Sequence, residues 1–179
     1  MSLLLATLLP GLLLLVLGVP LLLNHSGFVV LLKALPRSAT AAYVFFTAGA
    51  AAFLYNIWHL SPADFGDYRT ILFFAFAIIA ALAFKCVPDF LAVRGLCVLM
   101  LVAAAPLLGA AYMEYDLPQR LFMVALVYVG IALAIWLGAQ PWRMRDFLTW
   151  NFARPGRSRV AGAAFTGYGL LLVIVAFTY

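Results

Sequence analysis

Six apolar runs, separated by short polar segments, account for most of this 179-residue chain. Charged residues and clusters of Pro, Gly and Asn end each run. The runs cover residues 3–23, 39–59, 70–87, 93–113, 120–139 and 159–179. Because about 20 apolar residues in a helix cross the hydrocarbon core of a bilayer, the pattern predicts about six transmembrane helices. The third run is the shortest and contains Lys85 near its end. It can still span the membrane, because a lysine at the end of a helix can extend its charged group to the interface.

The composition supports an all-α integral membrane protein. Hydrophobic residues make up 68% of the chain and charged residues 9%, against about half and a quarter in a soluble domain. We therefore expect one transmembrane helical domain over residues 1–179, with no remainder for a soluble module. The first run extends from Leu3 to Leu23 with no preceding Lys or Arg, so it is interpreted as a retained span. We expect a multi-pass protein of a cell membrane, specifically a bacterial inner membrane.

The distribution of basic residues predicts the orientation of the chain. Nine of the eleven Lys and Arg residues lie in or beside the first, third and fifth connectors between runs. The second and fourth connectors contain only Arg69 and Arg120, together with four acidic residues. Since cytoplasmic loops are enriched in Lys and Arg, both termini are predicted on the outer side, an N-out/C-out arrangement. The net charge of +5 then reflects topology, and no nucleic-acid partner is expected.

The odd connectors share a pattern that favours three tandem helical hairpins. Pro20 and Pro141 mark turns, and apolar or aromatic stretches follow at residues 28–32 and 147–150. Each stretch leads to Arg beside small residues, and a shortened version surrounds Pro88. Convergence is the competing explanation, because any polytopic protein needs helix stops, interfacial segments and basic anchors.

The fifth connector is the first of two candidate contact regions. It is rich in arginine and tryptophan, contains a single acid, and is predicted to bind anionic lipid headgroups. Docking of another subunit is the alternative. The residues concerned are Trp142, Arg143, Arg145, Trp150, Arg154, Arg157 and Arg159.

The second candidate region is the outer loop with His59, Asp64, Asp67 and Arg69. An ordered loop in the interfacial aromatic belt is the favoured interpretation, and a small-ligand or partner contact is the alternative. A haem held by two histidines is not expected, because His25 and His59 are predicted on opposite faces, about 30 Å apart. No cofactor is predicted, and tetrapyrrole ligation by His59 alone is the less favoured alternative.

Small residues in the returning helices predict close helix packing. Gly49, Gly162 and Gly167 are the positions selected, because glycine lets two helix backbones approach closely in lipid. These faces are expected to pack inside the bundle or against a partner.

The predicted spans contain no deeply placed ionisable residue, and no catalytic triad, carboxylate pair, metal cluster or phosphate-binding loop is evident. We therefore expect a non-catalytic accessory or scaffold subunit of a membrane complex, in contact with lipids and with other subunits or further copies of itself. A small oligomeric transporter or channel is the alternative, and it would be marked by helix breaks at Pro10, Pro20 and Pro106. A lipid- or cofactor-binding enzyme that uses His59 with an outer-loop carboxylate is the third possibility.

Overall fold

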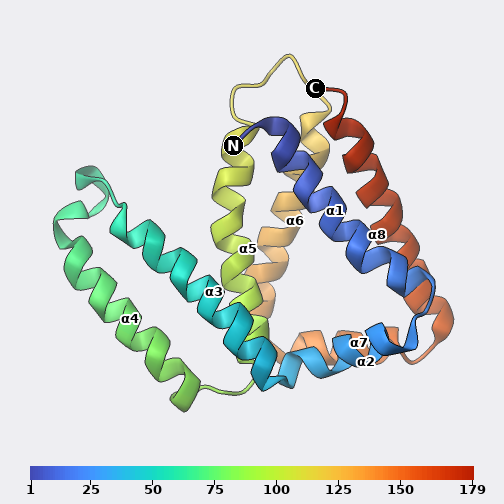
Figure 1. Ribbon diagram of the computed structural model, residues 1–179, viewed down its shortest axis with the longest axis horizontal. Coiled ribbons are helices and arrows are strands. Elements are labelled where there is room, and N and C mark those ends of the chain that lie inside the picture. The colour runs from blue at the N-terminus through green and yellow to red at the C-terminus, as the bar shows by residue number, and fades with distance from the viewer.

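The computed structural model describes residues 1–179 and is entirely helical, with 83% of the chain in helices (Figure 1). Six helices are long and apolar enough to cross a membrane, which confirms that part of the prediction and indicates a multi-pass membrane protein. These helices are α1 (Leu3–Leu22), α3 (Ala39–Trp58), α4 (Arg69–Cys86), α5 (Leu91–Ala110), α6 (Arg120–Ala139) and α8 (Pro155–Ala176).

Local signals explain where the long helices begin. Ser2 and Ser38 cap α1 and α3, since each hydroxyl accepts a hydrogen bond from a backbone N–H in the first turn. Helix α8 begins at Pro155, four residues before the predicted run that starts at residue 159. Proline is favoured there because its fixed φ suits the first helical turn, where its missing N–H costs nothing.

Short helices form the connectors. Helix α2 (Ser26–Ala34) and the 3₁₀ turn η1 (Leu35–Arg37) follow α1, and helix α7 (Trp142–Asn151) follows α6. Helices α2 and α7 contact each other and lie across the lower end of the long helices in Figure 1. Two further turns, η2 (Pro62–Asp64) and η3 (Gly66–Tyr68), connect α3 to α4.

The long helices do not pack in the tandem order that the connectors suggested. Helix α1 packs along α8, α3 packs against α4 and α5, and α5 packs against α6 (Figure 1). The predicted hairpin pairs were α1 with α3, α4 with α5, and α6 with α8, and none of these is a main interface. Three hairpins therefore do not describe the packing, because the closest contacts form wherever glycine faces meet.

Glycines allow direct contact between backbones in both of the most extensive interfaces. A Cβ atom at Gly162 would lie 2.7 Å from the Leu21 carbonyl carbon of α1. At Gly95 it would lie 2.6 Å from the Phe45 carbonyl carbon of α3. Since neither position has room for a side chain, these glycines set the distances between α1 and α8 and between α3 and α5.

The buried core is small and lies where α1, α5, α6 and α8 meet. Only 28 of the 179 residues are buried, so most apolar side chains face outward, as lipid permits. Met123, Val127 and Leu172 fill the largest cluster. Helix α4 contributes no buried residue. It is held to α3 by aromatic pairs, namely Tyr43–Phe84, Phe53–Phe76 and Trp58–Phe73, whose ring centroids are 5.0, 5.2 and 5.4 Å apart.

Candidate functional site

Most of the positive charge of the chain is gathered at one end of the molecule. At this end α1, α4 and α6 finish and α3, α5 and α8 begin, and we call it the basic end. Both termini and the connectors that precede α4 and α6 lie at the opposite end (Figure 1). The nine basic residues of the odd connectors therefore share one end, because the long helices alternate in direction.

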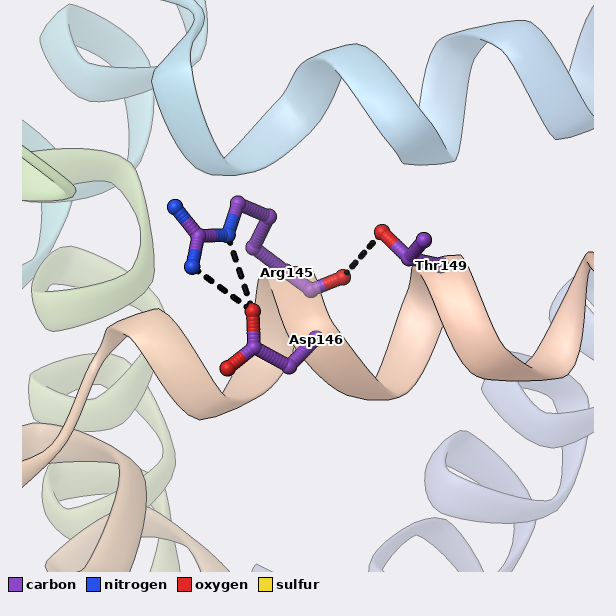
Figure 2. A network of polar contacts seen from close by, with 3 residues as sticks. All are labelled: Arg145, Asp146 and Thr149. Carbon is purple, nitrogen blue, oxygen red and sulfur yellow. Dashed lines mark hydrogen bonds and ion pairs between the residues drawn. The ribbon is translucent and has the colours of Figure 1, made fainter.

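Helix α7 holds the first part of the fifth connector on the surface of the basic end. Arg145 pairs with Asp146 at 2.7 Å, and the Thr149 hydroxyl donates a hydrogen bond of 2.8 Å to the Arg145 carbonyl (Figure 2). The Arg143 guanidinium lies 5.9 Å from the centre of the Trp136 ring. Trp142 is exposed beside them. Trp142, Arg143 and Arg145 therefore all lie at the surface of α7.

The second part of the fifth connector turns the chain into α8. Arg157 donates a hydrogen bond of 3.1 Å to the Trp150 carbonyl, and its guanidinium lies 4.4 Å from the Trp150 ring centre. This cation–π contact and this hydrogen bond stabilise the turn between α7 and α8. Arg154 and Arg159 are exposed. The seven predicted contact residues therefore lie in one region. Within it, Arg157 also connects the start of α8 to Trp150 of α7.

Two further arginines, Arg37 and Arg94, lie in this region, although the sequence pattern did not indicate them as contact residues. Arg37 of η1 and Arg145 of α7 both lie beside the ring of Phe90, which precedes α5. Arg94 follows Phe90 by one helical turn. Arg37 and Arg145 lie in connectors far apart in the sequence, so no local signal indicates that they meet at one ring.

The outer loop is ordered by its own turns. The His59 Nδ1 atom lies 2.8 Å from the Tyr55 carbonyl, and its ring packs against the Tyr55 ring. Asp64 accepts a hydrogen bond of 2.8 Å from the Ser61 hydroxyl. Asp67 and Arg69 are exposed and form no ion pair. In the loop His59 is therefore hydrogen-bonded to its own helix, and Asp64 to Ser61.

The two histidines cap different helices. His25 precedes α2 at the basic end, where its Nδ1 atom accepts a hydrogen bond of 3.4 Å from the Phe28 N–H. His59 follows the far end of α3, and a helix of that length spans about 30 Å. No group of three or more His, Cys, Asp or Glu side chains is close enough together to hold a metal ion. The two imidazoles therefore lie at opposite ends of α3, since His25 is at the basic end and His59 follows the last residue of α3.

The three selected glycines have different surroundings. A Cβ atom at Gly49 would lie 3.1 Å from the Gly95 carbonyl oxygen of α5, and Gly162 packs directly on α1. In contrast, a Cβ atom at Gly167 would have no neighbour within 4 Å. Gly167 therefore has no packing role within the chain, and its small face is open to lipid or to another protein.

The prolines do not break the helices. Helix α1 continues through Pro10 and Pro20, and α5 continues through Pro106. The helix breaks that would mark a transport pathway are absent.

Comparison with known proteins found no match to a protein-family model, to a curated protein or to a solved structure.

Proposed function

We propose that this chain is a non-catalytic accessory or scaffold subunit of a larger membrane complex. The observation that carries the proposal is the isolation of α4. This helix has 18 residues, none of them buried, and it packs mainly on α3. Its outer stripe of bulky apolar residues consists of Ile71, Phe74, Ile78 and Leu82, each at least half exposed.

A second neighbour for α4 would fit the physics of helices in lipid. Association there depends on van der Waals packing and modest hydrogen bonds, because lipid tails are as apolar as the side chains. The stripe on α4 follows the three- and four-residue spacing of a single helix face. A partner helix could pack along the whole stripe. Self-association through the same face would be the homomeric version of this role.

The alternatives have less support. The hypothesis of a transporter or channel requires discontinuous helices, whereas α1 and α5 are continuous through their prolines. The hypothesis of an enzyme requires His59 beside an acidic residue, whereas His59 bonds to its own helix.

We also propose an N-out/C-out orientation in a bacterial inner membrane. The support is the grouping of nine of the eleven basic residues at one end, since such residues are retained on the cytoplasmic side. Internal duplication of the first and third hairpins remains part of the proposal. It is supported by the equivalent places of α2 and α7, which lie across the basic end after the first and fifth spans.

The test is purification of the tagged chain from its native membrane in a gentle detergent. Mass spectrometry would identify co-purifying chains and their stoichiometry. Replacing Ile78 with tryptophan adds bulk to the α4 stripe without disturbing a buried contact of the chain, since Ile78 is 59% exposed. We expect this variant to fold and to lose its stoichiometric partner.

Ile135→Trp provides the matched control, because Ile135 on α6 is 61% exposed. It should retain the partner. A stoichiometric partner kept by the Ile78→Trp variant would overturn the role of α4. Absence of any stoichiometric partner or self-association would overturn the scaffold proposal as a whole.

A further inference from the structure

Two arginines from separate connectors lie beside one aromatic ring at the basic end, and a third arginine follows that ring by one helical turn in the sequence. The guanidinium carbon of Arg37 lies 5.4 Å from the centre of the Phe90 ring, and that of Arg145 lies 5.9 Å away. Arg94 is one turn after Phe90 on α5. The turn η1 contacts both α5 and α7, so tertiary packing brings Arg37 and Arg145 to the same ring, beside the start of α5 where Arg94 lies. We call Arg37, Arg94, Arg145 and Phe90 the arginine cluster.

The Phe90 ring is held firmly in the middle of the cluster. Its ring packs against the buried group formed by Val93, Cys97 and Ala134. The backbone of Phe90 has a φ of 57°, in the left-handed region that non-glycine residues rarely adopt. Such a conformation persists only when the surrounding structure imposes it. The ring is therefore a fixed platform against which cationic side chains are placed.

The positive charge of the cluster is largely uncompensated within the protein. Arg145 pairs with Asp146, and this is the only ion pair in the structure. Neither Arg37 nor Arg94 has an acidic partner, and neighbouring Asp89 is exposed and unpaired. The Nε atom of Arg94 is buried and donates to no protein acceptor. A buried donor without an acceptor is unfavourable, and the exposed Arg37 guanidinium, which has no acidic partner, is the group that an anion can reach.

Figure 2 shows that Arg145 reaches away from α7. Its side chain extends toward the blue ribbon of α2 and η1, the segment that contains Arg37. The Arg145 guanidinium therefore lies on the side of α7 that faces α2 and η1, and its acidic partner comes from its own helix. An anion could bind here without displacing an interaction between elements.

We propose that the arginine cluster binds the phosphate of an anionic phospholipid headgroup. Guanidinium groups form bidentate, charge-assisted hydrogen bonds with phosphate oxygens, and several of them can share one phosphate. The cluster lies at the end of the apolar helices, which is the depth of the headgroups when those helices span a bilayer. The proposal does not depend on the accessory role, because it concerns the surface that this chain presents alone.

An apolar groove begins close to the cluster and could take an acyl chain. Val98 is one turn beyond Arg94 on α5, and residues four apart lie on the same side of a helix. Val98 lines a groove of about 190 Å³ between α3, α4 and α5, and every residue of its lining is hydrophobic. On α3 the groove extends from Phe46 to Leu54, about 12 Å along the helix. The site therefore offers a phosphate position and a hydrocarbon channel side by side, which favours a lipid over a free anion.

The test measures lipid binding by the full chain in nanodiscs of phosphatidylcholine. The probe is fluorescent phosphatidylglycerol, and its displacement by unlabelled lipid gives a dissociation constant. Arg37→Gln and Arg94→Gln should each weaken binding by about tenfold or more, the size expected for losing a hydrogen bond to a charged group. Arg37 is exposed, so that variant avoids any effect of Arg94 on folding.

Lys33→Gln is the control, because Lys33 on α2 is an exposed basic residue of the same end that lies outside the cluster and outside the predicted contact residues of the fifth connector. It should change the dissociation constant less than twofold. Equal losses in all three variants would overturn the proposal in favour of diffuse charge attraction. Inorganic phosphate at millimolar concentration should fail to displace the lipid, and displacement that depends on Arg37 would overturn the lipid as the occupant.

Discussion

Replacing single glycines with alanine on α8 tests whether direct backbone contact holds the bundle together. Gly162 and Gly167 lie in the same helix, five residues apart. Gly162 is packed on α1, with its virtual Cβ atom 2.7 Å from the Leu21 carbonyl carbon and 2.8 Å from the Leu22 Cα atom. The virtual Cβ atom of Gly167 has no neighbour within 4 Å. One methyl group is thus added to each of two positions that differ only in their surroundings.

The structure sets the size of the expected effect. Carbon atoms are in favourable contact at about 3.5–4.0 Å, so alanine at position 162 requires α1 and α8 to separate by about 1 Å. A gap of that size forfeits a quarter to a half of each van der Waals contact along the interface. Overpacking of this kind costs about 1–3 kcal/mol. The gain in helix propensity from glycine to alanine, up to about 1 kcal/mol, is common to both variants and cancels in the comparison.

Equilibrium unfolding in mixed micelles of mild detergent and dodecyl sulfate measures this difference, with helix content followed by circular dichroism. We expect Gly162→Ala to be less stable than Gly167→Ala by about 1–3 kcal/mol. A second matched pair lies on α5. Gly95 packs on α3, whereas the virtual Cβ atom of Gly109 has no neighbour within 4 Å. If the two variants of each pair had equal unfolding midpoints, the claim that Gly162 and Gly95 set the distance between helices would be refuted.

Two further predictions concern orientation and the attachment of α4. Cysteines introduced at Asp64 and Glu114 should react with an impermeant thiol reagent in intact cells, and a cysteine at Arg157 should not. The reverse labelling pattern would show that both termini are cytoplasmic. Phe84→Ala should loosen α4 from α3, because two aromatic contacts are lost, each contributing about 0.5–1.5 kcal/mol. Hydrogen exchange in α4 should then accelerate, more than in an Ile78→Ala control, and an unchanged rate would contradict this role of Phe84.

The long helices could be predicted from the sequence because their signals are local. About 20 apolar residues are needed to cross a bilayer, and charges or prolines end each run within a few residues of the observed boundary. The alternation of basic and acidic connectors can also be read from the local sequence. Because the six helices alternate in direction, the basic connectors lie at one end of the molecule and the acidic connectors at the other (Figure 1).

The helix partners could not be predicted, because lipid and protein interiors are similarly apolar. In water a polar face identifies the outside of a helix, but here the outward faces are as hydrophobic as the inward ones. Twelve of the 20 residues of α1 are leucine, and the helix has no charged residue on any side. Only the tertiary structure decided that α1 packs on α8, which is the helix farthest from it along the chain.

The glycines show the same limit at single residues. Gly162 and Gly167 appear equivalent in the sequence, but five residues correspond to about 140° around a helix, so they face different directions. Gly169 is seven residues from Gly162 and faces the same way, and both pack on α1.

Likewise, the sequence by itself determined that each odd connector contains arginine, whereas packing of η1 on both α5 and α7 decided that Arg37 and Arg145 share the Phe90 ring. The physical reason is the same in both cases. Residue type and spacing specify a helix and its depth in the membrane, but the rotation of each helix follows from shape complementarity between elements distant in sequence.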